Sequence, residues 1–330
     1  MIGDKSSTES ILYPTILVTG CGGDIGMGIG RILKMSEVCE RVIGCDVHKD
    51  HPGIFIFDEC EVVQGADSEN FLETISETII RHSVDLIIPT SEPELRFLYN
   101  KNLLSLIANV PVLVPNEKAM TVGLDKLKTA DFLKSINLPY PWTKVVKEGI
   151  PAELPCIIKS RYGSGSRDVQ LVHEEMAEGF FRRRPEHIWQ EYLQPDTQEY
   201  TCGLYRSKDG NIRTIIFKRQ LKYGVTAFGE VAENADITNV LCKIAEALEL
   251  CGSINVQLRL TDRGPVVFEI NSRFSSTVVF RHMLGFEDLI WSLTEKGGGA
   301  LKPYKPQPPG AKIYRSSQEI ICDRKGAENQ

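Results

Sequence analysis

The chain has 330 residues, which is enough for roughly two domains of ordinary size. Hydrophobic residues make up 42% and charged residues 25%, proportions that exclude a disordered or fibrous protein. The formal net charge of −6 argues against nucleic-acid binding, because such binding needs clustered lysine and arginine. The one dense basic run, Arg182–Arg184, is more typical of a solvated helix end than of a binding patch.

Nine cysteines form no C-x-x-C pair and no cysteine–histidine cluster at zinc spacing. We expect reduced and mostly buried thiols. The first ten residues are too polar for a signal peptide, and no segment approaches the length of an apolar membrane span. The sequence therefore predicts a cytoplasmic protein that does not contact a membrane.

Residues 1–115 alternate short apolar runs with amphipathic stretches. The segments, in chain order, are Ile16–Thr19, Ile25–Met35, Arg41–Cys45, Phe71–Arg81, Asp85–Pro89, Glu94–Ile107 and Val112–Val114. Strands that alternate with helices predict a parallel sheet covered on both faces. We therefore expect an α/β fold that starts with a Rossmann-like domain.

The rest of the chain is predicted to be α+β. Residues 116–188 are expected to form linker helices, one of them at Lys126–Ile136, and a small subdomain with strands at Cys156–Lys159 and Val169–Val172. Residues 189–330 are expected to form an antiparallel subdomain because strands follow one another there with few helices between them. Its expected elements are strands at Trp189–Leu193, Tyr200–Tyr205, Ile212–Phe217, Ile254–Leu260, Pro265–Ile270 and Lys312–Tyr314, and a helix at Ile237–Leu250.

The turn Thr19–Gly26 follows a strand and opens a helix, and Asp46 ends the next strand. This layout is that of a dinucleotide-binding fingerprint, and the turn resembles that of short-chain dehydrogenases. Their catalysis also needs Tyr-x-x-x-Lys on one helix, and the only match, Tyr140 to Lys144, is interrupted by proline. The turn could instead make a tight junction or bind another anion. An NAD(P)-dependent oxidoreductase or epimerase stays an alternative.

A predicted hairpin near the C-terminus carries oxygen donors on neighbouring strands. Glu269 and Asn271 are two residues apart and share a face, and pairing could bring Gln257 alongside them. One carboxylate and two amides suit Mg²⁺, with Mn²⁺ as an alternative. Arg273, on the same face, could meet phosphates. Lys159 ends a strand just before the glycine- and serine-rich loop Gly163–Ser166, and it could neutralise a polyphosphate.

From about Lys126 to Arg281 the chain resembles the ATP-grasp superfamily, and more narrowly the stand-alone relatives of carbamoyl-phosphate synthase large subunits. The matching pieces occur in the order of that family. They are Asp125-Lys126, Pro155–Lys159 with the glycine loop, Trp189–Leu193, Glu199–Thr201, Phe217–Arg219, Asn255–Gln257 and Phe268–Arg273. Asp168, where glycine is common, and Ser272, where proline is usual, depart from the pattern.

The resemblance implies a role for each matching residue. Lys126 and Lys159 would contact ATP phosphates under a lid formed by Gly163, Ser164, Gly165 and Ser166. Glu191, Tyr192 and Leu193 would read adenine, and Glu199 would hold the ribose. Gln257, Glu269 and Asn271 would bind Mg²⁺, and Lys218 or Arg219, with Arg273, would stabilise the transferring phosphoryl group.

The implied enzyme is an ATP-dependent ligase that joins a small carboxylate, such as an amino acid, to an amine through an acyl phosphate. Such transfer needs positioning and charge neutralisation rather than a covalent nucleophile. Arg281 and His282, or Ser91 and Glu92, are candidates for binding the carboxylate substrate. A homodimer is compatible with the sequence. A catalytically silent ATP-binding subunit is the second alternative.

Overall fold

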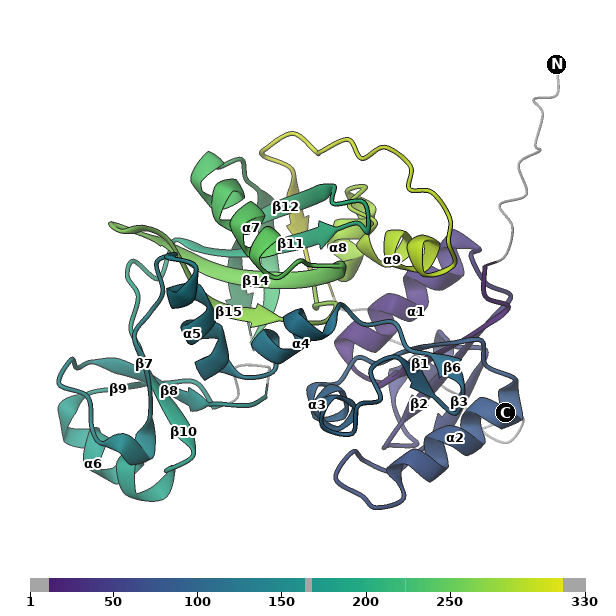
Figure 1. Ribbon diagram of the computed structural model, residues 1–330, viewed down its shortest axis with the longest axis horizontal. Coiled ribbons are helices and arrows are strands. Elements are labelled where there is room, and N and C mark those ends of the chain that lie inside the picture. Colours follow the sequence, from purple (N-terminus) through teal and green to yellow (C-terminus); the bar gives the residue numbers. More distant parts are fainter. Residues whose placement is uncertain (1–11, 164–167, 223, 317–330) are drawn as a thin grey trace. The chain divides into compact units, whose positions relative to one another are not determined.

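The computed structural model describes residues 12–163, 168–222 and 224–316. They divide into two compact units, shown in Figure 1: residues up to Leu113 together with Ile290–Leu301, and Val114–Leu289 together with the segment from Lys302. Among these residues no helix is both long and apolar enough to cross a membrane.

The first unit is built on a parallel sheet, as the sequence predicts, and its strand order is β3-β2-β1-β4. The edge strand β3 was not expected, because its sequence Glu-Cys-Glu-Val is polar and half-exposed. The helix α3 ends well before Ile107, since Asn102 takes a left-handed conformation. The elements are β1 (Thr15–Thr19), α1 (Asp24–Ser36), β2 (Arg41–Asp46), the 3-10 turn η1 (Pro52–Phe55), β3 (Glu59–Val62), α2 (Phe71–His82), β4 (Leu86–Ile88), α3 (Glu92–Asn100), β5 (Leu106–Ile107) and β6 (Val110–Pro111).

The second unit begins with two helices and a small antiparallel sheet of order β7-β10-β8-β9. Helix α6 covers this sheet, and Trp189, Ile158 and Ala177 pack in the core between them. The elements are α4 (Glu117–Gly123), α5 (Lys126–Ser135), β7 (Thr143–Val145), the 3-10 turn η2 (Val146–Glu148), β8 (Cys156–Ser160), β9 (Gln170–Val172), α6 (Glu174–Arg183) and β10 (His187–Glu191).

A larger antiparallel sheet of order β15-β14-β11-β12-β13-β16 completes the second unit. The strand β13 was not expected, whereas β16 has the predicted bounds. The elements are β11 (Glu199–Arg206), β12 (Ile212–Lys222), β13 (Val225–Val231), α7 (Ala235–Ala247), β14 (Gly252–Thr261), β15 (Gly264–Asn271), α8 (Val278–Met283) and β16 (Lys312–Tyr314), while α9 (Asp288–Lys296) begins in this unit and continues in the first.

The two faces of this sheet have opposite character because side chains alternate along each strand. One face, which includes Tyr200, Cys202 and Val256, packs with α7 in the largest apolar core of the unit. The other carries charged and amide side chains from neighbouring strands, among them Glu199 and Gln257. The alternation thus sends the polar residues of the predicted motifs to one surface.

At one end of the polar face lies a buried ion pair. Arg281 Nη1 donates to Asp288 Oδ2 at 2.8 Å, and both side chains are almost fully buried. Ser253 Oγ donates to the same carboxylate oxygen at 2.6 Å. Arg281 also donates to Asn255 and Ser275, so the network joins α8 and Asp288 to the sheet.

Replacing Asp288 by alanine should lower the free energy of unfolding by roughly 3–5 kcal/mol, because it leaves the Arg281 charge buried without a partner. The matched control is Lys118→Ala, which breaks the exposed pair with Glu249 and should cost less than about 1 kcal/mol. Urea denaturation measures both. Equal losses in the two variants would contradict the stabilising role of the buried network.

Candidate functional site

A cavity of about 380 Å³ lies within the second unit and is lined from both of its sheets. This size is within the range of small-molecule sites. Its walls mix apolar side chains with charged ones. The lining residues are Lys126, Ile157, Lys159, Ser160, Tyr162, Gly163, Asp168, Val169, Gln190, Glu191, Leu193, Glu199, Arg219, Leu221, Gln257, Arg259, Phe268 and Glu269.

Glu269 on β15 is the anionic centre of this cavity. Burial alone would raise the pKa of its carboxyl group, but the charges of Lys126, Lys159, Arg219 and Arg273 outweigh burial and hold that pKa below its usual value. Glu269 is therefore ionised at neutral pH. Gln257 lies directly opposite it in the β14–β15 register, as the predicted hairpin requires.

Lys159 on β8 extends from the small sheet to the hairpin of the large one. Its ammonium group donates to the Phe268 backbone carbonyl at 3.4 Å and lies 5.7 Å from the centre of the Phe268 aromatic ring. The side chain is only 5% exposed. Burial, together with the Lys126 charge, lowers its pKa to about 8 although Glu269 and Glu199 oppose the shift. An anionic ligand would restore full protonation of this lysine.

Glu199 on β11 is held by two arginines. Its Oε1 accepts from Arg219 at 3.0 and 2.8 Å, and its Oε2 accepts from Arg259 at 3.2 and 2.9 Å. Four hydrogen bonds match the acceptor capacity of a carboxylate. Arg219 also donates to Gln257 Oε1 at 2.8 Å, so Glu199 fixes a guanidinium beside the hairpin.

Lys126 begins α5, where Asp125 caps the helix by accepting from the Leu127 amide at 3.0 Å. The Asp125 carboxylate also takes a two-point contact from Arg161, at 2.9 and 2.7 Å. Lys126 donates to the carbonyl of Gly163, a residue whose positive φ of 105° favours glycine. The helix start and the loop after β8 are thereby tied together.

The segment predicted to read adenine, residues 191–193, forms a hinge that begins at the last residue of β10. The Glu191 amide donates to the Trp142 carbonyl at 2.9 Å, and the side chain accepts from Arg263 at 2.5 Å. The Leu193 carbonyl accepts from Arg259 at 2.5 Å, so that acceptor is already engaged. Glu191 and Leu193 line the cavity, whereas Tyr192 lines only a second pocket, which Glu191, Leu193 and Arg263 also line.

Not every predicted residue reaches the cavity. Lys218 is paired with Tyr200 and lies on the opposite face from Arg219. Asn271 and Arg273 follow Glu269 but are not among the lining residues, although the Arg273 charge acts on Glu269. The predicted lid residues Ser164, Gly165 and Ser166 lie outside the described residues.

Sequence reasoning missed Arg259 and Gln190. Arg259 lies two residues after Gln257 on β14, so strand periodicity could have placed it on the same face. Gln190 precedes the hinge and is 4% exposed, with its amide donating to Thr143 at 3.1 Å. It lies within the matching piece Trp189–Leu193, but the resemblance assigned a role only to the three residues that follow it.

Two further groups of predicted residues behave differently. Arg281 is fully buried in its pair with Asp288, so it does not offer a charge to a substrate.

In the first unit, the glycine turn opens α1, and a Cβ at Gly26 would lie 2.3 Å from the Gly20 carbonyl oxygen. Asp46 accepts from the Gly22 and His48 amides at 3.0 and 3.1 Å, and this use of the carboxylate favours a structural junction.

Comparison with known proteins supplies the family. Residues 124–277 match the model of an ATP-grasp domain. This match covers slightly less than half of the chain. A carbamoyl-phosphate synthase from Methanobrevibacter smithii is 23% identical over 109 residues, which are 31% of this chain and 30% of that protein. The predicted resemblance to the ATP-grasp superfamily is thereby confirmed.

Solved structures agree with this fold. The N5-carboxyaminoimidazole synthetase of Staphylococcus aureus, complexed with ADP, superposes with a TM-score of 0.69 at 19% identity, over 90% of this chain and 80% of that one. An L-amino acid ligase from Bacillus licheniformis gives a TM-score of 0.62 at 16% identity, over 82% and 69% of the two chains. At these identities the likeness shows the fold. The names of these neighbours agree with the predicted enzyme class, ATP-dependent ligase.

The depressed pKa of Lys159 predicts a pH dependence of nucleotide binding. A phosphate needs the ammonium form, so the affinity for Mg-ADP should fall by about tenfold per pH unit above pH 8 as free Lys159 loses its proton. A Lys159→Arg variant stays charged and should keep its affinity nearly constant to pH 9.5. Calorimetric titration from pH 7 to 9.5 measures this. An equal decline in both proteins would assign the effect to another group.

Proposed function

We propose that this chain is a ligase that transfers the γ-phosphoryl group of ATP to a substrate carboxylate, with release of ADP. An amine then attacks the resulting acyl phosphate and displaces inorganic phosphate, which completes a C–N bond. The observation that carries the proposal is the convergence of Lys126, Lys159 and Arg219 on the ionised Glu269 within one cavity. Cationic side chains around a carboxylate can give up some of their contacts with it and bind the oxygens of a polyphosphate instead.

The nucleotide would be divided between the apolar and the charged walls. Ile157, Leu193 and Leu221 offer apolar surface to the adenine base, beside the hinge backbone. Lys159 and Lys126 would contact the phosphates, with Gly163 beside them. Glu199 has its acceptors filled by arginines, so a ribose contact there would require one of them to move.

Arg219 would act on the transferring group. Its guanidinium is fixed by Glu199 and Gln257, so it can stabilise equatorial oxygen charge without a large reorganisation. Arg273, whose charge acts on Glu269, would assist it. Lys218 lies on the other face of the sheet, and we leave it out of the proposed site.

The residues present fit Mg²⁺. Glu269 supplies an ionised carboxylate, Gln257 lies opposite it, and Asn271 shares the face of Glu269 on β15. Oxygen donors with one charge suit a cation that takes its remaining ligands from water and phosphates. Bound there, Mg²⁺ (or Mn²⁺) would neutralise charge on the phosphate oxygens.

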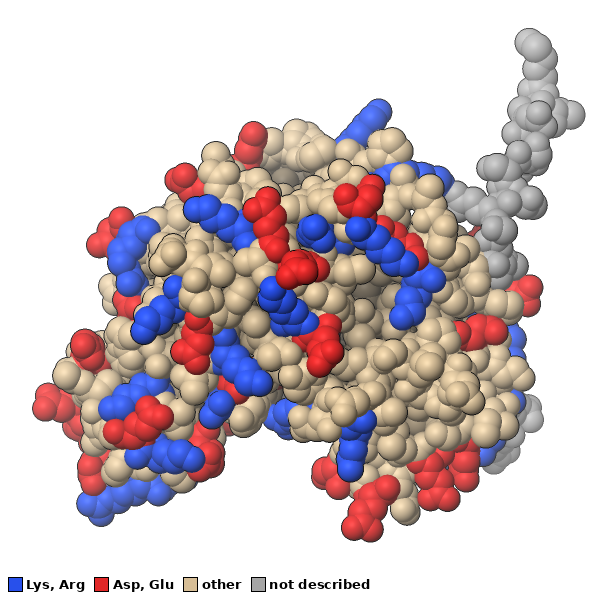
Figure 2. Space-filling view, viewed as in Figure 1, with Lys and Arg blue, Asp and Glu red and all other residues tan. Residues whose placement is uncertain are grey.

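The substrate class follows from the reaction rather than from a recognised acceptor pocket. We propose a small carboxylate such as an amino acid, because no basic surface suited to a polymer is visible: on the face drawn in Figure 2, lysine and arginine are interspersed with aspartate and glutamate. The eight described cysteines are free, half of them buried, and we place the reaction in the cytoplasm, where thiols stay reduced.

Replacing Glu269 by glutamine should lower ADP release by at least 100-fold, because the cations lose their anionic partner and the metal its charged ligand. The assay follows ADP formed from Mg-ATP across a panel of amino acids and other carboxylates. Glu246→Gln, on the exposed side of α7, is the matched control and should retain wild-type turnover. Near-normal turnover by the Glu269 variant would overturn the assignment.

Mass spectrometry of the product separates the remaining alternatives. A carboxylate-dependent product with a new amide bond supports the ligase. Binding of Mg-ATP without any carboxylate-dependent ADP release would instead support a silent ATP-binding subunit.

A further inference from the structure

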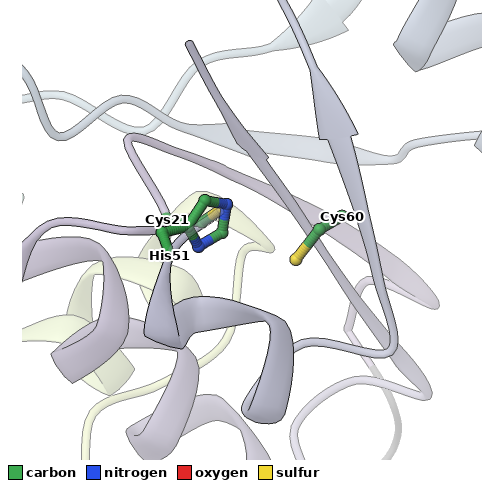
Figure 3. A group of neighbouring side chains, drawn as sticks. All are labelled: Cys21, His51 and Cys60. Carbon is green, nitrogen blue, oxygen red and sulfur yellow. The ribbon is translucent and has the colours of Figure 1, made fainter. Parts of the chain in front are cut away.

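A group of metal-ligating side chains lies in the first unit. Among the residues that the structure describes, Cys21, His51 and Cys60 present one ligand atom each, all within 4.8 Å of one another (Figure 3). Cys21 follows β1, His51 directly precedes η1, and Cys60 lies on β3. The three residues come from segments that are separate in the sequence.

The absence of a side chain at Gly44 allows the Cys21 and Cys60 thiols to lie close together. Gly44 on β2 is paired with Cys60, and a Cβ on Gly44 would lie 2.8 Å from the sulfur of Cys21. Any larger residue there would push the Cys21 thiol away. The thiols of Cys21 and Cys60 can therefore approach one another across the intervening strand.

The imidazole of His51 is held in place by the backbone around it. A Cβ on Gly22 would lie 2.7 Å from Cγ of His51, and one on Gly53 would lie 2.9 Å from Nδ1. Nδ1 is buried and has no hydrogen-bond partner, whereas Nε2 and the Cys21 Sγ form a hydrogen bond of 3.6 Å. The ring is therefore held with Nε2 toward the Cys21 thiol.

The separation of the Cys21 Sγ and the His51 Nε2, 3.6 Å, matches that of two ligands on a tetrahedral ion. Zinc bonds of about 2.3 Å to sulfur and about 2.0–2.1 Å to nitrogen place the two atoms about 3.5 Å apart at a tetrahedral angle. Two thiols and an imidazole also favour zinc over Mg²⁺, which prefers oxygen. The donor set is thus chemically distinct from that of the Glu269 hairpin.

We propose that Cys21, His51 and Cys60 bind one Zn²⁺ ion, with the fourth coordination position open to water or a small ligand. Binding links the turn after β1 to the segment before η1 and to the edge strand β3. The ion also requires both thiols in the thiolate form, so binding releases protons and weakens as the pH falls. This site is independent of the proposed ligase activity.

The test uses the full-length protein without an affinity tag, reduced and stripped of metal. Zn²⁺ is titrated in competition with a chromophoric chelator, and Co²⁺ is added separately to detect thiolate-to-metal absorption. We expect one tight equivalent of Zn²⁺ in the wild type. Cys60→Ser should bind at least tenfold more weakly, since even the loss of an outer-shell partner commonly costs roughly 10–100-fold.

The matched control is Cys39→Ser, a half-buried cysteine of the same unit outside the cluster, which should bind zinc like the wild type. Thermal unfolding in chelator checks that each variant is folded, and added Zn²⁺ should raise the midpoint for the wild type and Cys39→Ser only. Equal zinc affinity of Cys60→Ser and the wild type would overturn the proposal. The proposal would also be overturned if Cys21 and Cys60 form a disulfide in air and the reduced protein does not bind zinc tightly.

Discussion

The negative charge of Glu269 is the interaction on which the candidate site depends. Lys126, Lys159, Arg219 and Arg273 all act on this carboxylate, and without it their mutual repulsion would oppose folding of the cavity. Burial disfavours both charged forms, so it raises the pKa of Glu269 and lowers that of Lys159. The surrounding cations reverse the shift of Glu269, whereas Glu269 and Glu199 only partly oppose the shift of Lys159. The site therefore holds a compact cluster of cations ready for an anion.

The alternation of side chains along the strands places the cluster residues of the large sheet on one face of that sheet. Residues two apart on β14 and β15 project from one face of the large sheet, while the other face packs against α7. Arg219 and Lys218 show the consequence, because adjacent residues of one strand serve opposite faces. The apolar core fixes the strands, and the strands in turn orient the polar groups. The orientation of these groups does not require a loop to become ordered.

Much of this could be predicted from the sequence. The Glu269–Asn271 spacing and the turn before it were sufficient to predict a hairpin that brings Gln257 opposite Glu269. The choice between Lys218 and Arg219 could not be made, since it needs the register of β12 against β11. The engagement of Glu199 by two arginines was likewise hidden, because their partners lie on neighbouring strands far apart in the chain.

The cysteine cluster illustrates the same limit. Sequence spacing indicated no zinc motif, yet the order β3-β2-β1 and a glycine on the middle strand bring Cys21, His51 and Cys60 together. Edge strand β3 was missed because its residues are too polar and too exposed to give a strand signal. Contacts across a parallel sheet depend on strand order, which local patterns do not encode.

A crystal structure of the chain with Mg-ADP tests the central claim most directly. The account predicts phosphates at Lys159 and Lys126, adenine against Leu193, and the metal on Glu269. Nucleotide bound instead at the glycine turn that follows β1, with the Glu269 cavity empty, would contradict it.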